Sequence, residues 1–501
     1  MKGVDKKTII RRTLYMLQVV FIALATTGCG ERNPVLQVEG GLIKGVKTQT
    51  KGVYVYRGIP YAAPPLGNFR WKEPQPVTAW SGIRLCDRFG HPSFQTAHYP
   101  GLYTTEWGYG NEAAYSEDCL FLNVWTNAPG RPEEKLPVAL FIHGGGFCEG
   151  WGSEPEFDAQ QWAKKGVVLV TFNYRLGVFG FMAHPELSAE SERGVSGNYG
   201  LLDMIAALKW IHSNIAQFGG DAGNVMLFGQ SAGADGVRKL CESSLSEGLF
   251  NKAIIMSGDG LRDNDSIVRG HQDLTLQEAE QNCKKILDWA GLTDLEKMRA
   301  AQTEVIFSLN SVYNMVHGGT AAERFEYEPG ITQRPILDNY TSIRSFDNAA
   351  IKDSLHHVTY MIGFTMHDYL KDMRDAIDEF CLNRDSCGDK VYAYQFARPL
   401  PTEDGTRQLE GAFHSADLWY VFGSMRHSNR PWTKGDAQIS EAMLTTWTNF
   451  AKTGNPGLGW EPYTKDKPQY MIFKLDESGR NASEMGYPID GNNIFHRTPF
   501  D

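Results

Sequence analysis

The chain has 501 residues, about three times the length of a usual domain. Apolar residues make up 42% of it and charged residues 22%, ordinary values for a globular protein that exclude a disordered, fibrous or collagen-like chain. The formal net charge is −10, and the lysines and arginines do not cluster beyond the N-terminus. We therefore expect no nucleic-acid partner, because such a partner requires a basic face.

The first 28 residues differ in kind from the rest. Basic residues precede an apolar run from Leu14 to Ala25, and small residues follow it, which is typical of a signal peptide. We therefore expect an exported protein, either secreted or lipid-anchored to a bacterial cell envelope. Gly28-Cys29 is similar to a lipoprotein cleavage site, in which Cys29 becomes the first mature residue, but Thr26 departs from the usual pattern. Lipidation of Cys29, the only membrane attachment we expect, stays open.

Residues 34–501 contain no internal repeat and no low-complexity linker, so we predict a single domain. Short β-branched runs typical of a buried parallel sheet alternate with segments of helical periodicity. The expected strands are Val138–His143, Val167–Asn173, Val225–Phe228, Ala253–Met256, Thr359–Ile362 and Val391–Phe396, and the expected helices include Leu201–Phe218 and Leu274–Ala290. This alternation predicts an α/β fold with a large, mostly parallel central sheet and helices on both faces.

A serine lies in a glycine-rich turn between an expected strand and an expected helix. The segment Gly229-Gln230-Ser231-Ala232-Gly233 has the pattern G-x-S-x-G in the strand-to-helix context that gives it meaning. The glycines let the backbone turn sharply and expose the Ser231 hydroxyl, and the helix N-terminus favours developing negative charge. The pattern predicts that Ser231 is a nucleophile, the alternative being a purely structural turn.

A run of glycines ends an earlier expected strand. His143 is followed by three glycines, and acyl transfer needs N–H groups aimed at an oxyanion, which glycines allow the backbone to approach. We expect Gly145, Gly146 and Ala232 to supply these N–H groups. We expect His143 to anchor the loop rather than to act as a base.

These residues resemble type-B carboxylesterases, a family that includes the cholinesterases, within the α/β-hydrolase fold. The similarity extends from about Gly40 to about Tyr463. The matching segments are Tyr56–Ala62, Ser116–Trp125, His143–Phe147, Asn173–Gly177, Phe218–Asp221 and the turn at Ser231. The resemblance implies an α/β-hydrolase with insertions around the active-site mouth, a small-molecule ester as substrate, and no metal or organic cofactor.

The resemblance also implies the other two members of a catalytic triad. Asp368 takes the place of the family's acid, although the family usually has Glu followed by Gly, and Tyr369 replaces that glycine. Asp372 is a second candidate for the acid. His414 matches the family's base, and the order Ser, Asp, His agrees with the fold. The predicted enzyme is a serine hydrolase that cleaves carboxylic esters through an acyl-enzyme, with Ser231 as nucleophile.

Further features are carried over from the family. The resemblance implies a disulfide between Cys86 and Cys119 that closes a loop over the active-site mouth. Cys381 and Cys387 form a small clip or stay free. The other cysteines of the mature chain are expected to be buried thiols: Cys148, Cys241 and Cys283. Two pairs resemble the family's buried ion pairs: Arg70 with Glu117, and Arg175 with Asp203.

Three residues are candidates for the substrate pocket: Trp107, Phe147 and Gln230. Trp107 lies near the position where cholinesterases carry a tryptophan that stacks on a quaternary ammonium, but its spacing to Cys119 differs, which favours a packing role. Gln230 stands where the family usually has Glu. Losing one charge about 5 Å from a bound cation, at an effective dielectric of about 20, forfeits about 3 kcal/mol of attraction. We therefore predict short-chain or bulky neutral esters as substrates.

Three other functions remain as alternatives. A lipase shares the same serine turn and would prefer long acyl chains. A cholinesterase-like enzyme would hydrolyse choline esters. A catalytically inactive binding or adhesion module of the same fold is disfavoured, because the serine, the histidine, the oxyanion glycines and an acid are all present.

Overall fold

The computed structural model describes residues 33–96, 101–107, 114–261, 273–317, 330–368, 372–402 and 411–489. The predicted signal peptide, with Cys29, lies outside the described residues. From Val35 onward the described residues form one compact unit. None of the helices in these ranges is both long enough and apolar enough to cross a bilayer.

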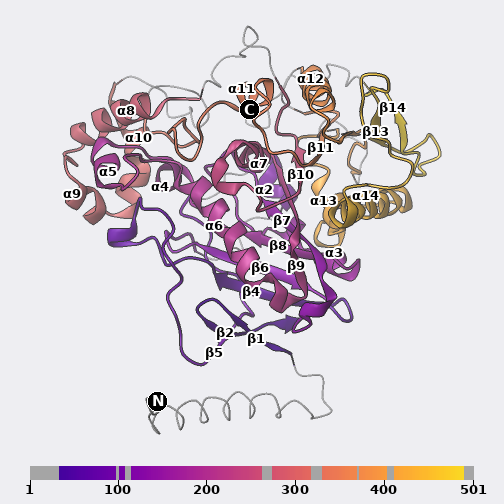
Figure 1. Cartoon of the computed structure of the whole chain (residues 1–501), viewed down its shortest axis with the longest axis horizontal. Coiled ribbons are helices and arrows are strands. Elements are labelled where there is room, and N and C mark those ends of the chain that lie inside the picture. Colours follow the sequence, from indigo (N-terminus) through magenta and orange to yellow (C-terminus); the bar gives the residue numbers. More distant parts are fainter. Residues whose placement is uncertain are drawn as a thin grey trace, which may run out of the picture. The chain divides into compact units, whose positions relative to one another are not determined.

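A large mixed sheet lies at the centre of this unit (Figure 1). Among the described residues it has eleven strands, in the order β14-β13-β12-β11-β10-β9-β7-β8-β6-β4-β3. Neighbours from β13 to β8 pair in parallel, and antiparallel pairs complete both edges. The strands are β3 Val46–Lys47, β4 Tyr54–Pro60, β6 Phe121–Thr126, β7 Leu136–Ile142, β8 Val168–Phe172, β9 Gly220–Gln230, β10 Lys252–Met256, β11 Thr359–Thr365, β12 Val391–Phe396, β13 Tyr470–Phe473 and β14 Glu484–Gly486. The predicted fold class is confirmed.

Both faces of the sheet are covered by apolar side chains because strand residues alternate between them. On β7, Val138 and Leu140 pack into one core cluster, whereas Phe141 packs into another. The first cluster is covered by α6 Tyr199–Asn214, α7 Ala232–Glu242, α11 Phe346–Ile351 and α12 Met373–Ser386. The second is covered by α3 Gln160–Lys164, α13 Leu418–Phe422 and α14 Lys434–Thr453. The central strands are therefore buried on both sides.

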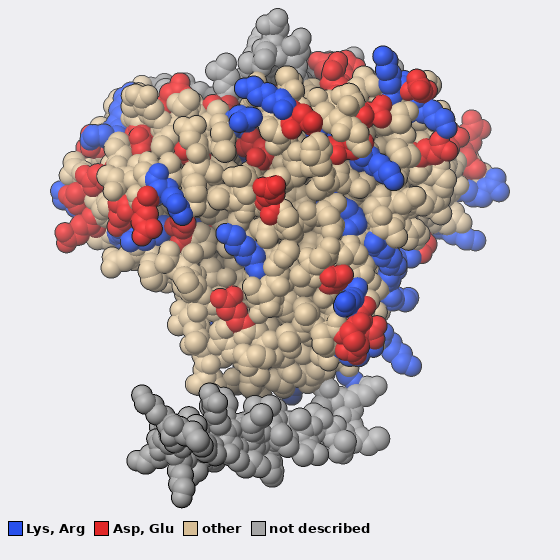
Figure 2. Space-filling view, viewed as in Figure 1, with Lys and Arg blue, Asp and Glu red and all other residues tan. Residues whose placement is uncertain are grey.

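Two smaller groups of elements complete the fold. A three-stranded sheet is formed by β1 Val35–Val38, β2 Gly41–Lys44 and β5 Ile83–Leu85. A helical group with its own apolar cluster is formed by α4 Gly177–Phe181, α5 Pro185–Glu190, α8 Leu276–Trp289, α9 Leu295–Ala300 and α10 Thr303–His317. Figure 1 shows this group on one side of the central sheet. On the face shown in Figure 2, acidic and basic side chains are interspersed, so neither sign of charge dominates it.

The predicted helices agree with the structure except at their ends. The expected helix Leu201–Phe218 is α6 followed by a 3-10 turn over Ile215–Phe218. Gly219 adopts a left-handed conformation that ends this turn. Helix α8 begins after Thr275, whose side chain forms a capping box with Glu278.

The two predicted ion pairs are confirmed. Arg70 lies 2.6 Å from Glu117, and Arg175 lies 2.7 Å from Asp203, with all four side chains buried. Each arginine also donates to backbone carbonyls, which satisfies the rest of its guanidinium. These pairs fasten loops to the core.

The disulfide expected from the resemblance is not formed. Cys86 and Cys119 are free thiols in the structure, each 1% exposed or less, within the same apolar cluster. The Cys86 backbone is bonded on both sides, to Lys44 and to Arg57, and the Cys119 thiol contacts Ser93. Burial raises the pKa of Cys86 to about 12, so both side chains pack as small apolar groups. Cys381 and Cys387 are likewise free, as are Cys241 and Cys283.

Candidate active site

Ser231 occupies a strained turn between β9 and α7. Its φ is 58° and its ψ is −128°, a conformation that costs a non-glycine residue about 1–3 kcal/mol. Its N–H donates to the carbonyl of Met256 at 2.9 Å, and its carbonyl accepts the N–H of Asp235 at 3.0 Å. A Cβ on Gly233 would lie only 2.0 Å from the carbonyl oxygen of Ile142, so the second glycine of the pattern is required for close packing.

His414 and Asp368 meet as predicted from the family resemblance. The Nδ1 of His414 lies 2.8 Å from Oδ1 of Asp368, and both side chains are almost fully buried. Asp368 follows β11, and its other oxygen accepts the hydroxyl of Thr365 at 3.1 Å. Burial alone would raise the pKa of Asp368, but the charge and hydrogen bond of His414 hold that pKa below its usual value.

Asp372, the second candidate for the acid, occupies a different structural position. It is the residue that precedes α12, with a φ of 59°. The carboxylate at His414 Nδ1 is that of Asp368. The geometry therefore favours Asp368.

Gln230 brings the serine turn and the histidine together. Its side-chain nitrogen lies 3.1 Å from Nε2 of His414, and the residue is 3% exposed. With Nδ1–H directed at Asp368, Nε2 of His414 carries a lone pair that the Gln230 amide can donate to. Because Gln230 directly precedes Ser231, the nucleophile candidate and the base candidate occupy one site.

The glycine loop after β7 lies beside this turn. Gly145 and Gly146 have φ values of 96° and 63°, which favour glycine. A Cβ on Gly144 would approach Cβ of Ser231 to 3.0 Å, so the loop and the serine turn are in contact range. Ala232, the third expected N–H donor, is the first residue of α7.

His143 anchors this loop, as predicted. Its ring stacks on Tyr174 with centroids 4.5 Å apart, and the Tyr174 hydroxyl donates to the His143 carbonyl. Nδ1 lies 2.9 Å from the carbonyl oxygen of Gly144. Burial lowers the pKa of His143 to about 4, so the ring is neutral at physiological pH.

Two of the pocket candidates are packed in the core. Trp107 is 4% exposed and lies against Trp419, with ring centroids 5.1 Å apart. Phe147 is 3% exposed and packs edge-on against Phe181. The packing interpretation of Trp107 fits this arrangement better than a cation-stacking one, because the residue is buried and its ring packs against those of Trp419 and Tyr103.

Sequence reasoning missed a second carboxylate close to the triad. Asp417 is fully buried and accepts the hydroxyl of Tyr394 at 3.1 Å. Burial raises its pKa to about 6, and the nearby charge of Asp368 acts in the same direction. Its position just after His414 was visible in the sequence, but its proximity to Asp368 depends on the fold.

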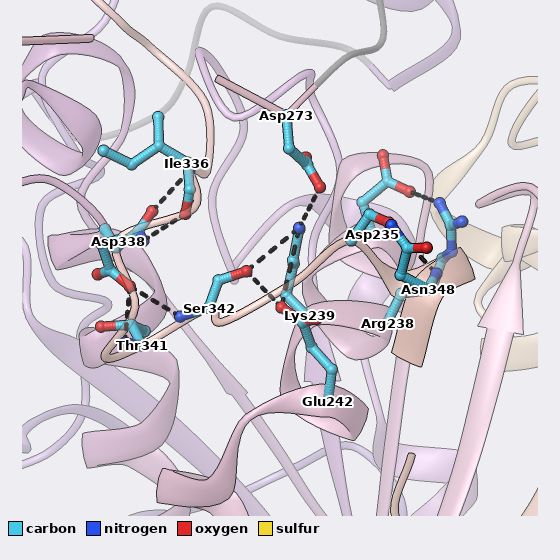
Figure 3. A network of polar contacts seen from close by, with 12 residues as sticks. Asp235, Arg238, Lys239, Glu242, Asp273, Ile336, Asp338, Thr341, Ser342 and Asn348 are labelled. Atoms are coloured by element: carbon cyan, nitrogen blue, oxygen red, sulfur yellow. Dashed lines mark hydrogen bonds and ion pairs between the residues drawn. The ribbon is translucent and has the colours of Figure 1, made fainter. Parts of the chain in front are cut away.

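The far end of α7 is fixed by a buried polar network (Figure 3). Lys239 lies 2.8 Å from Asp273 and 3.3 Å from the Ser342 hydroxyl, which also donates to Glu242. Asp338 accepts three backbone N–H groups, from residues 340 to 342, and so orders the loop that carries Ser342. Helix α7 is therefore held at both ends. Within the described ranges, no group of three or more His, Cys, Asp or Glu side chains is arranged to hold a metal ion.

The comparisons with known proteins agree with this geometry. The model of the carboxylesterase family matches residues 32–385 and 376–487. The chain belongs to the carboxylesterase family. It is 46% identical over 467 residues to the fumonisin B1 esterase of Sphingopyxis macrogoltabida, covering 89% of this chain and 76% of the relative. It is 29% identical over 503 residues to the para-nitrobenzyl esterase of Bacillus subtilis (strain 168), covering 90% and 96%.

Solved structures of the family share the fold. A PNB esterase structure superposes with a TM-score of 0.71 at 27% identity, covering 90% of this chain and 97% of that chain. The protein is therefore a carboxylic ester hydrolase of the carboxylesterase family, with a small ester as substrate.

Proposed function

We propose that the protein cleaves carboxylic esters through a covalent acyl-enzyme formed on Ser231. The 2.8 Å contact between His414 and Asp368, made beside the serine turn, is the observation that supports it most directly. Such a contact fixes the imidazole tautomer so that the other nitrogen, Nε2, carries the basic lone pair, which in this structure faces the side-chain amide of Gln230. The strained turn that bears Ser231 supports its role as the nucleophile.

In this mechanism, His414 takes the hydroxyl proton of Ser231 as its oxygen attacks the ester carbonyl. The backbone N–H groups of Gly145, Gly146 and Ala232 bind the oxyanion. The alcohol leaves with the proton carried by His414, and a water molecule activated by the same histidine then hydrolyses the acyl-enzyme. Asp368 holds the imidazole and stabilises its cation.

Neutral esters are the proposed substrates. Gln230 places an uncharged amide beside His414 where the family usually has a carboxylate, so a cationic alcohol group gains no local charge partner there. Burial of Trp107 against Trp419 also leaves its ring less suited to stack on a quaternary ammonium. A butyrylthiocholine rate equal to that for a matched neutral thioester would contradict this proposal.

A second candidate substrate is fumonisin B1 itself. The relative that hydrolyses it shares 46% identity over 467 residues, considerably more than the other relatives described above. Incubation of the purified protein with fumonisin B1, followed by mass spectrometry of the products, tests this directly. Release of the free alcohol would assign the substrate, and intact fumonisin B1 would exclude it.

A p-nitrophenyl ester series from acetate to palmitate tests the reaction class. We expect the highest kcat/KM with short acyl chains and no activation by an oil–water interface. An optimum at palmitate with interfacial activation would indicate a lipase instead. Failure of an organophosphate to label Ser231, together with the absence of hydrolysis, would favour a binding module.

We also propose that the protein is exported and lacks residues 1–28 in its mature form. The basic and apolar pattern of this segment supports the proposal. Cell fractionation and the intact mass of the purified mature protein test it. A mass that includes two acyl chains and a glyceryl group would assign lipidation at Cys29, and retention of the full N-terminus in the cytoplasm would contradict export.

A further inference from the structure

The segment that carries His414 is contacted by a helix from a distant part of the chain. Its described residues are Leu102–Trp107 (α2). The hydroxyl of Tyr103 donates to the backbone carbonyl of His414 at 3.2 Å, and the Tyr103 ring packs edge-on against Phe413. Its position against this segment is fixed by side-chain contacts.

A buried ion pair supplies the strongest of these contacts. The Glu106 carboxylate accepts hydrogen bonds from Nε of Arg430 at 2.8 Å and from Nη2 of Arg430 at 2.5 Å. It also accepts the indole N–H of Trp419 at 2.7 Å. The Glu106 side chain is 4% exposed and that of Arg430 is 13% exposed. Arg430 also lies over the ring of Phe413, the residue next to His414.

These contacts link the helix to the base from two sides. Glu106 holds α2 against the 413–430 segment, and Tyr103 of the same helix meets the carbonyl of His414. The imidazole of His414 is held by Asp368. We propose that Glu106 and Arg430 are positioning residues for the catalytic base and act through α2 and Tyr103. This inference rests on the proposed function of His414.

The expected loss of kcat follows from the positional precision that proton transfer requires. Displacing a reacting group by about 1 Å can lower a rate about 10²-fold. Glu106→Gln keeps the size of the side chain and an acceptor for Trp419 but removes the charge that holds Arg430. We expect it to lower kcat about 100-fold with KM unchanged. Tyr103→Phe removes only the hydrogen bond to His414, and we expect a kcat loss of about tenfold, from one lost hydrogen bond.

The matched control is Asp389→Asn, which breaks another buried pair with an arginine. Asp389 lies 3.0 Å from Arg384 and precedes β12, so it is at the N-terminal end of the parallel strands, whereas Asp368 is at their C-terminal end. Like Glu106→Gln, this variant should lower the melting temperature, but it should leave kcat unchanged. All rates are divided by the number of sites that an organophosphate labels at its end point, which removes the contribution of unfolded protein.

Three outcomes decide the inference. A selective kcat loss in Glu106→Gln and Tyr103→Phe supports it. An unchanged kcat per labelled site in both variants, or an equal kcat loss in Asp389→Asn, overturns it. His414→Ala, measured in parallel, separates this from failure of the proposed function. If His414→Ala retains turnover, the base assignment itself is wrong.

Discussion

The two ends of α7 satisfy their polar groups in different ways. At its start, Ser231 is held in a strained conformation by backbone hydrogen bonds, and the polar side chains nearby converge on one imidazole. At its end, Lys239 and Glu242 are buried and their partners come from the 273–342 region (Figure 3). Helix α7 therefore has the reactive serine at one end and a stabilising polar network at the other. Substitutions at the start should change turnover, and those at the end should change the free energy of unfolding.

The largest expected effect is that of Ser231→Ala. Removing the nucleophile of a serine hydrolase lowers kcat about 10⁶-fold, so we expect turnover near the detection limit. The melting temperature should not fall, because the Ser231 side chain contributes no cap to α7. Steady-state kinetics and calorimetry measure the two quantities. Substantial turnover in the variant would show that α7 does not present the nucleophile.

Asp368→Asn should have the next largest effect. The amide supports the wrong tautomer of the histidine, and in other triads this change lowers kcat about 10⁴-fold. Asp372→Asn is the matched control, because this residue precedes α12 and should leave kcat unchanged. A reversal, with Asp372→Asn as the inactive variant, would reassign the acid.

Glu242→Gln should change how stability depends on pH. Burial raises the pKa of Glu242 from 4.5 to about 7, despite the nearby charge of Lys239. Between these values the folded state holds a proton that the unfolded chain releases, so the free energy of unfolding falls as pH rises through this window. The loss is about 3 kcal/mol by pH 8, since each pKa unit corresponds to about 1.4 kcal/mol.

Urea unfolding of the wild type and of Glu242→Gln, at pH 4.5 and at pH 8, measures this contribution. The decrease between the two pH values should be smaller in the variant by that amount, because glutamine does not titrate. Equal decreases in both proteins would mean that Glu242 is not the titrating group. kcat at a fixed pH should be the same in both.

The smallest effect is expected from Asp273→Asn. Asp273 lies 2.8 Å from Lys239 and its side chain is 24% exposed, so solvent screens part of the attraction. We expect a loss of about 1 kcal/mol in the free energy of unfolding at pH 8 and unchanged kcat. Asp288→Asn, in an exposed pair with Lys284, is the control and should lose less. A larger loss in the control would contradict the role assigned to burial.

The sequence allowed the serine turn at the start of α7 to be predicted, but not the polar network at its end. Glycines around Ser231 and the short strand before it report on local backbone geometry, which a motif can encode. The network at Glu242 joins residues far apart in the chain, and no spacing rule relates Lys239 to Asp273 or to Ser342. Such partners become visible only when the chain folds.

The same distinction applies to the rest of the site. His414 and Asp368 were found by order and resemblance, and their contact agrees with that prediction. The contact between Gln230 and His414, and the burial of Asp417 beside the triad, were not predicted. The Cys86–Cys119 disulfide was carried over from the family, whereas in the structure both cysteines are free thiols within one apolar cluster.

The buried position of Trp107 has a consequence for protein engineering. This residue looks like an obvious target for a library intended to widen the range of accepted alcohols, because related enzymes carry an aromatic residue nearby. Here its ring packs against those of Tyr103 and Trp419, and its helix also contacts the histidine loop. Random substitution there would yield many inactive clones, because it would disturb the packing that holds α2 against the histidine loop.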